Sequence, residues 1–177
     1  MRSWWAAVIS MGVCLSGCME HGSKVRADQA EDHFQRHKAD YERIVTLVAS
    51  CRPERRGADA GYNRVWADGS TGEKLYCQRD GQSTNAIMRA LQGADAVSVS
   101  YLTSDGPGVS SGASELRSVS IGVYSAGIVP SGTSIDFVYV AQALESPPQN
   151  EIGDGYGVER RLVGGSPRHW YWERSWN

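Results

Sequence analysis

The chain has 177 residues, of which 41% are hydrophobic and 21% are charged, and its formal net charge at pH 7 is −2. This length suits one domain, and this composition excludes both an intrinsically disordered chain and a multi-span membrane protein. The near balance of acidic and basic residues supplies no strong field for holding nucleic acid, so we expect no nucleic-acid partner.

The first 17 residues have the layout of a bacterial export signal. Arg2 provides a positive charge, and the ten residues from Trp4 to Val13 form an apolar stretch. A membrane-spanning helix needs about 20 apolar residues, whereas a signal-peptide core has about this shorter length. We therefore expect residues 1–17 to be a signal peptide that is absent from the mature protein.

A short motif follows the apolar stretch, Leu15-Ser16-Gly17-Cys18. It resembles the lipobox of bacterial lipoproteins, in which small residues precede an invariant cysteine. The resemblance implies that the chain is cut before Cys18 and that acyl chains on this residue anchor the protein to a membrane. Met19 rather than Asp follows, which in Gram-negative lipoproteins favours the outer membrane. The alternative is an ordinary secretory signal with an incidental cysteine.

Two cysteines remain once the signal peptide and the lipidated residue are set aside, Cys51 and Cys77. An oxidising compartment favours a disulfide between them, closing a loop of about 25 residues and stabilising the fold by roughly 3–4 kcal/mol. The alternative is a pair of free buried thiols. A cysteine-based metal site is disfavoured, because neither residue has a CxxC partner or a neighbouring histidine.

The mature chain divides into a tether and one domain. Residues 18–29 are polar and lack a hydrophobic period, which predicts a tether between the lipid and a domain that spans 30–177. The domain should begin with a long helix from about Ala30 to Ser50, ended by Pro53, because apolar residues recur at the spacing of one helical face. The residues of this face are Phe34, Tyr41, Ile44, Val45 and Val48.

Helical periodicity gives way to alternation along the rest of the chain. A short second helix is predicted from Ser83 or Thr84 to Gln92, ended by Gly93. From Ala96 onward, apolar residues occupy every second position, which is typical of half-buried strands. The expected extended segments are 62–66, 74–77, 97–101, 118–123, 135–139, 156–163 and 168–176.

This order of elements predicts an α+β fold, in which the long helix lies across one face of an antiparallel meander. The last sixty or so residues contain a strand, a Gly-rich turn at Gly164-Gly165-Ser166-Pro167 and a Trp-Tyr-Trp strand. This pattern resembles the aromatic hairpin that ends small uncharacterised bacterial lipoproteins. The resemblance supports the fold and implies no catalytic activity.

One motif matches the nucleophile elbow of hydrolases. Residues 108–112 read G-x-S-x-G around Ser110, and Asp136 or Asp154 and then His169 follow in hydrolase order. The elbow requires a strand that turns directly into a helix, whereas this motif lies in a Gly- and Ser-rich loop and precedes a predicted strand. We therefore favour a loop without a catalytic role.

A pair of histidines suggests a metal site. His33 and His37 are four residues apart on the long helix, with Asp40 one turn further, and this spacing can chelate a divalent cation. The glutamate of an H-E-x-x-H motif is missing between them, so no base is available to activate a bound water. We favour an ordinary helix surface and expect no metal or cofactor.

The last strand has two different faces. His169, Tyr171 and Glu173 alternate with Trp170, Trp172 and Trp176. The tryptophan face is favoured as core beneath the long helix, with a partner surface as the alternative.

A histidine–glutamate pair on the other face of this strand can perform acid–base chemistry. Glu159 or Arg160 is expected across the hairpin from Glu173. Cross-strand ion pairing is a more common role for such residues than acid–base catalysis, and we favour it.

These observations lead to one functional hypothesis and one alternative. The favoured hypothesis is a lipid-anchored, non-enzymatic module that binds another envelope protein, as an inhibitor, an immunity protein or an accessory subunit. Its partner would engage Tyr171, His169 and Glu173 together with the loops 103–115 and 143–155, because loops on a rigid scaffold often carry binding residues. The alternative is a small periplasmic hydrolase that acts on cell-wall or carbohydrate material.

Overall fold

The structure is a computed structural model that describes residues 20–53, 63–67, 75–77, 83–104, 115–128 and 131–177. The lipobox with Cys18 and the G-x-S-x-G motif at 108–112 lie outside these residues. No helix in the described ranges combines the length and the apolar character needed to cross a bilayer.

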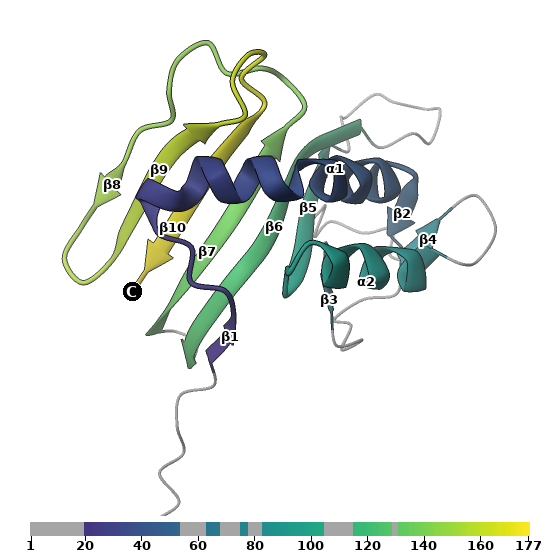
Figure 1. The fold of residues 1–177 in the computed structure, drawn as a ribbon, viewed down its shortest axis with the longest axis horizontal. Helices are drawn as coiled ribbons and strands as arrows, with labels where there is room; N and C mark the ends of the chain where they lie inside the picture. The colour runs from purple at the N-terminus through teal and green to yellow at the C-terminus, as the bar shows by residue number, and fades with distance from the viewer. Residues whose placement is uncertain (1–19, 54–62, 68–74, 78–82, 105–114, 129–130) are drawn as a thin grey trace, which may run out of the picture.

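The predicted long helix is confirmed as α1 (Ala30–Ala49). It crosses the middle of the sheet (Figure 1), so only one side of the helix loses contact with water. At its end, the hydroxyl of Ser50 donates a hydrogen bond to the carbonyl of Leu47 at 2.7 Å. The buried residues of α1 are Ala30, His33, Phe34, Tyr41, Ile44 and Val48, so the predicted apolar face is the core-facing side, with Val45 partly buried beside it.

The second helix is also confirmed, as α2 (Ser83–Gly93). It lies beside α1 on the same side of the sheet (Figure 1), where Ile87 and Leu91 are fully buried. Both helices therefore cover one face of the sheet, and no helix of the described residues lies on the other face.

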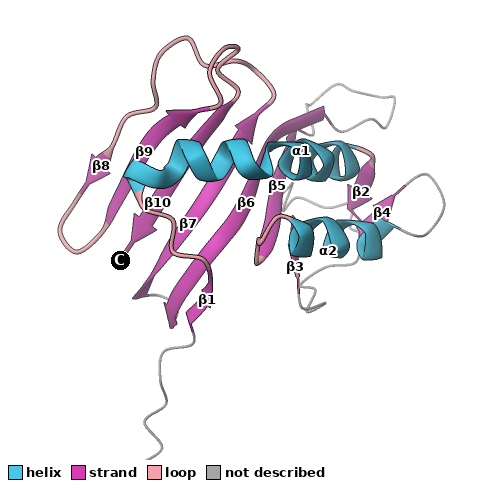
Figure 2. Cartoon of the chain, viewed as in Figure 1, coloured by secondary structure: helices cyan, strands magenta, loops and turns pink. Residues whose placement is uncertain are grey.

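In the described part of the chain, eight strands form one antiparallel sheet. Their order is β3-β5-β6-β7-β10-β9-β8, and β1 pairs with β6 (Figure 2). The strands are β1 (Glu20–Gly22), β3 (Asn63–Trp66), β5 (Ser98–Ser104), β6 (Glu115–Ile128), β7 (Ser131–Val140), β8 (Glu151–Ile152), β9 (Gly157–Val163) and β10 (Trp170–Trp176). The structure thus confirms the α+β fold with a helix packed on an antiparallel sheet.

Strands β5, β6 and β7 are neighbours in chain order, as in a meander, but the strands after them are not. β10 lies between β7 and β9, so the chain leaves β7, crosses to the outer edge at β8 and β9, and returns inward. The connection at 141–156 is long enough for this crossing. Alternation of apolar residues identifies strands but does not say which strands are neighbours, which is why the order differs from a strict meander.

The prediction of a free tether is wrong for residues 20–29. Glu20–Gly22 form β1, which pairs with β6, and the amide of Ser23 donates to the carbonyl of Val123 at 2.9 Å. Val25 has only 4% of its surface exposed and belongs to the core. A three-residue strand is too short to show a hydrophobic period, so backbone pairing alone reveals it.

The two remaining strands form a separate pair, β2 (Cys51–Pro53) with β4 (Leu75–Cys77). Their backbone register places Cys51 directly opposite Cys77. This arrangement brings together the two positions for which a disulfide is predicted.

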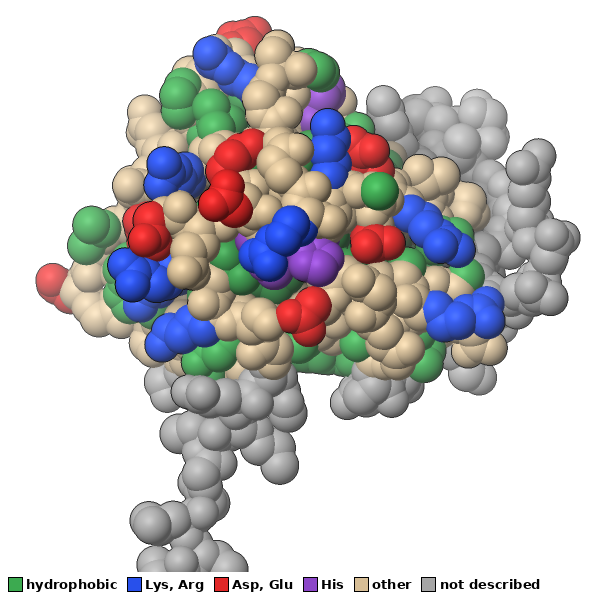
Figure 3. All heavy atoms as spheres, in the orientation of Figure 1, with side chains coloured by type: hydrophobic (Ala, Val, Ile, Leu, Met, Phe, Trp, Pro, Cys, Tyr) green, Lys and Arg blue, Asp and Glu red, His purple; other side chains and the backbone are tan. Residues whose placement is uncertain are grey.

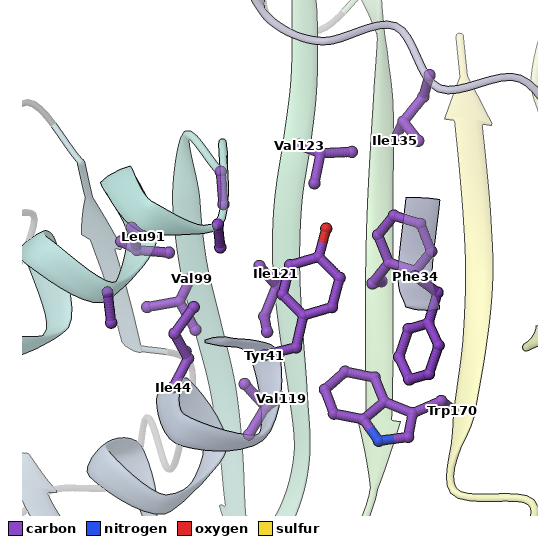
Figure 4. Close-up of a cluster of buried hydrophobic side chains, with 14 of the residues drawn as sticks. Phe34, Tyr41, Ile44, Leu91, Val99, Val119, Ile121, Val123, Ile135 and Trp170 are labelled. Atoms are coloured by element: carbon purple, nitrogen blue, oxygen red, sulfur yellow. The ribbon is translucent and has the colours of Figure 1, made fainter. Parts of the chain in front are cut away.

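Aromatic residues fill the core between α1 and the sheet (Figure 4). The ring centroids of Phe34 and Trp170 lie 5.3 Å apart, and those of Tyr41 and Phe137 lie 5.2 Å apart. Trp172 is 1% exposed. The tryptophan face of β10 is therefore core at Trp170 and Trp172, as favoured above, because these large side chains point under the helix.

Trp176 is only half-buried, at the end of β10. Its ring lies on Gly157 of the neighbouring strand, where an added Cβ would come within 2.1 Å of the indole. Glycine at this position allows the close approach.

Candidate functional site

The face of the sheet opposite α1 and α2, which we call the uncovered face, carries polar side chains of β10 and its neighbours. Glu173 lies directly opposite Arg160 of β9 and Asp136 of β7 in the strand register. Nε of Arg160 donates to the Glu173 carboxylate at 2.7 Å, which confirms the cross-strand ion pair. Glu173 is therefore paired with the guanidinium of Arg160 and is not available as a general base.

Arg160 also holds the segment that leads into β8. Its Nη1 donates to the Glu151 carboxylate at 2.7 Å and to the carbonyl of Gln149 at 2.8 Å, and its amide donates to the side chain of Asn150. Burial of the guanidinium acts to lower the pKa of Arg160, but the hydrogen bonds to Glu151 and Glu173 outweigh it and raise that pKa. One arginine thus joins β10, β9 and the approach to β8.

Asp136 takes part in a second polar network on the uncovered face. Its carboxylate accepts hydrogen bonds from Ser120 at 3.0 Å and Ser134 at 2.9 Å, and Ser134 also contacts Ser175 at 2.8 Å. Burial raises the pKa of Asp136, and the two serine hydrogen bonds oppose this shift.

The structure does not bring Asp136 and His169 together as a hydrolase would require. Asp136 pairs with Glu173 in the register, whereas His169 precedes Trp170, which pairs with Tyr139. His169 is four residues before Glu173, so at roughly 3.3 Å per residue about 13 Å of strand separates the two positions.

The three predicted partner residues, His169, Tyr171 and Glu173, do not share one surface. Tyr171 and Glu173 lie on the uncovered face, where burial and then the charge of Glu173 raise the pKa of Tyr171. His169 lies before β10, with Nδ1 2.8 Å from the carbonyl of Val140 and its ring stacked on Tyr139. The expectation that His169 shares a face with Tyr171 and Glu173 is wrong. His169 precedes β10, and it stacks on Tyr139, which packs on the helix-covered side of the sheet.

The histidine pair of α1 also differs from the expected helix surface. His33 is buried, with Nε2 3.0 Å from the Tyr41 hydroxyl and its ring stacked on Phe137 at 5.4 Å. Burial, followed by the charges of His37 and Arg36, lowers the pKa of His33 to about 4. The spacing His33, His37, Tyr41 is itself one helical face, and it was the available signal for this burial.

His33 and His37 lie close together on α1. The rings of His33 and His37 lie 4.7 Å apart. Over the described residues, no group of three or more His, Cys, Asp or Glu side chains is arranged to hold a metal ion.

Two exposed large apolar side chains, Ile152 and Tyr156, lie in residues 145–156, which we call the edge segment. Ile152 of β8 has 83% of its surface exposed, and Tyr156 has 54%. β8 is the edge strand at one end of the sheet (Figure 1), and hydrophobic side chains are visible at this end of the molecule in Figure 3. The loop around this segment was predicted to bind a partner, but periodicity did not single out either residue.

The backbone of the edge segment is closed by a tight turn. The amide of Gly153 donates to the carbonyl of Tyr156 at 3.0 Å, and Gly155 has φ of +83°, a conformation that side chains other than glycine rarely adopt. The ring of Tyr156 packs directly on Gly153, where an added Cβ would lie 2.1 Å away. The turn therefore presents Ile152 and Tyr156 on an ordered backbone.

The edge segment is acidic. It contains Glu145, Glu151 and Asp154 and no lysine or arginine. Glu151 is bound to Arg160, so Asp154, which lies between Ile152 and Tyr156 in the sequence, remains as the acidic group next to the exposed apolar residues.

Comparisons of this chain with protein-family models, with curated proteins and with solved structures find no match.

Proposed function

We propose that this protein is a lipid-anchored, non-enzymatic module of the outer membrane, facing the periplasm, and that it binds another protein through the edge segment. The observation that carries the proposal is the exposure of Ile152 and Tyr156 on a closed turn at the edge of the sheet. The lipobox at Leu15-Ser16-Gly17-Cys18 supports the membrane anchor.

Exposed apolar residues are common when they are scattered singly. Here an isoleucine and a tyrosine lie four residues apart in one turn, and Arg160 fixes the chain that leads into it. An ordered turn loses little conformational entropy when a partner binds, so more of the apolar burial contributes to affinity.

Charge indicates the kind of partner. Asp154 lies between Ile152 and Tyr156 in the sequence, Glu145 lies earlier in the edge segment, and this segment contains no basic residue. We infer that the partner is a protein with an apolar pocket rimmed by lysine or arginine, because complementary charge favours association and excludes partners with an acidic rim.

The test begins with a photo-crosslinking amino acid placed at position 152 in the full chain in cells. A crosslinked envelope protein is identified by mass spectrometry, purified, and titrated against the wild-type protein and two variants. Ile152→Glu adds like charge to an acidic surface and should weaken binding by about tenfold or more. The side chain lies outside the core, so folding should be unaffected.

Leu102→Ser is the matched control, because Leu102 is also an exposed hydrophobic residue but lies on β5, away from the edge segment. It should leave the dissociation constant unchanged. Equal affinity of wild type and Ile152→Glu, or a contact surface on the partner that is acidic, would contradict the proposal.

A further inference from the structure

The strand β1 begins close to the residue that is proposed to carry the lipid. Only Met19 separates Cys18 from Glu20, the first residue of β1. Two residues span at most about 7 Å even when the chain is fully extended. Acyl chains on Cys18 would lie in the hydrocarbon core, and the headgroup layer beside that core is about 5–8 Å thick. An acylated Cys18 therefore holds Glu20 at the membrane surface.

Several contacts fix β1 to the sheet. Its three residues pair with the backbone of Tyr124–Ala126 in β6. The amide of Ser23 donates to the carbonyl of Val123 at 2.9 Å, and Val25 is part of the core. Gly22 has φ of +84°, and an added Cβ would collide with the carbonyl of Val123, so this close approach requires glycine. The lipid is therefore attached to a fixed point of the sheet and not to a long free tether.

One row of residues crosses the sheet at the level of Glu20. Each member lies directly opposite the next in the strand register, in the order Glu20, Ala126, Thr133, Trp176, Gly157 and Ile152. We call this set the anchor row. Strands are about 4.8 Å apart, so Ile152 lies roughly 24 Å from Glu20 along the row. The lipid attachment point and the exposed residue of the edge segment therefore lie at the same end of the sheet.

The opposite end of the sheet lies far from the anchor row. From Trp176 back to Trp170, β10 extends over about 20 Å. The loop between β9 and β10 lies beyond Trp170, and Figure 1 shows this loop at the upper end of the sheet and β1 at the lower end. A domain that stands on the anchor row therefore holds this loop well away from the lipid headgroups.

The residue types of the anchor row suit the surface of a bilayer. Glu20 is the only charged member of the row, so the acyl chains and not an attraction to charged lipids would hold the domain there. Trp176 is half-buried, and the guanidinium of Arg174 lies 5.2 Å from the centre of its ring. Tryptophan is enriched where proteins meet lipid headgroups. The outer surface of α1, by contrast, carries many exposed charged residues, which include Glu31, Asp32, Arg36, Glu42 and Arg43.

We propose that the domain stands on the bilayer surface through the anchor row, with its strands directed away from the membrane. This orientation rests on the lipid anchor of the proposed function and adds the end of the sheet that faces the lipid. Because Ile152 belongs to the anchor row, the edge segment meets its protein partner at the membrane surface.

The test measures which amides lie near the lipid headgroups. The acylated protein is purified from membranes, checked by mass spectrometry, and placed in phosphatidylcholine nanodiscs that carry a spin label on the headgroup. The amide signals of Gly132 and Gly157, at the anchor row, should lose most of their intensity relative to label-free nanodiscs. Those of Gly164 and Ser166, in the loop between β9 and β10, should keep theirs.

A lengthened connection tests why the domain takes this orientation. An insertion of about 12 Gly and Ser residues between Met19 and Glu20 adds a flexible reach of roughly 20 Å and leaves the sequence of β1 unchanged. It should restore most of the signal of Gly132 and Gly157, because the lipid no longer holds the anchor row at the surface.

Two glycine variants separate the seating of β1 from the general effect of backbone strain. Gly22→Ala should detach β1 and reduce the signal loss at Gly132 and Gly157, as the insertion does. Gly165→Ala is the matched control, because Gly165 also has a positive φ, of +73°, but an added Cβ meets nothing within 4 Å. It should leave the pattern of signal loss unchanged.

The outcomes distinguish the orientation from the lipid anchor. A mass without acyl chains would contradict the anchor and the orientation together. Acylated protein with equal signal loss at the two ends, or with greater loss at Gly164 and Ser166, would contradict the orientation alone. An unchanged pattern in the insertion variant would also overturn the proposal, since the short connection from Cys18 to β1 would then not set the orientation.

Discussion

The imidazole of His33 lies 3.0 Å from the Tyr41 hydroxyl and is buried beneath α1. One hydrogen bond joins these two polar groups, so the hydroxyl and this ring nitrogen each have a partner in the core. Burial holds the pKa of His33 at about 4, well below its ordinary value of 6.5, so the ring is neutral in the folded protein at pH 7.

Acid should therefore weaken the fold through His33. Between pH 6.5 and about 4, the unfolded chain binds a proton at this histidine that the folded chain does not, so the free energy of unfolding falls as pH falls. The loss from this group is at most about 3 kcal/mol. Denaturant unfolding of His33→Gln at several pH values across this window should show a shallower pH dependence than wild type.

His37→Gln serves as the control for this measurement, because His37 is only half-buried on the same helix. It should retain most of the wild-type dependence on pH. Identical slopes for wild type and His33→Gln would show that the buried imidazole does not carry the effect.

A disulfide between Cys51 and Cys77 is the next prediction. These residues are directly opposite in the register of β2 and β4, and opposed Cα atoms in antiparallel pairs are about 4.5–5.5 Å apart, within the range that disulfides span. Neither thiol should react with an alkylating agent under denaturing conditions until a reductant is added. Alkylation of both without reductant would contradict the bond.

The two faces of β10 should respond differently to truncation. Trp172 is 1% exposed in the core, so Trp172→Ala should cost about 3–5 kcal/mol and lower the melting temperature by roughly 10 °C or more. Tyr171 is half-buried on the opposite face, and Tyr171→Ala should lower it by less than half as much. Thermal unfolding of the two variants side by side checks this, and the reverse order would contradict the assignment of the faces.

The proposed membrane anchor depends on one thiol, that of Cys18. If Cys18 is the acceptor, Cys18→Ala should abolish incorporation of labelled fatty acid and leave the protein unprocessed or in another compartment. Cys14→Ala is the matched control, since this cysteine lies within the predicted signal peptide and should not affect lipidation. Normal acylation of Cys18→Ala, detected by mass, would exclude the anchor.

Long periodic segments were predictable because their pattern is local. The 3.6-residue spacing from Phe34 to Val48 locates α1, and the alternation around Ile121 and Phe137 locates β6 and β7. Each of these elements repeats its period several times, so the side that faces the core is evident from the residue types. The α+β class followed from the order of these elements along the chain.

Contacts between distant segments decided the rest. β1 is too short to show a period, and only its pairing with β6 brings the residues that follow it over the sheet, where Val25 joins the core. Arg160 and Glu159 were equally possible neighbours of Glu173 until the register of β9 against β10 selected Arg160. Ile152 is exposed because β8 is the outermost strand, a position that depends on strand order and not on the residues around it.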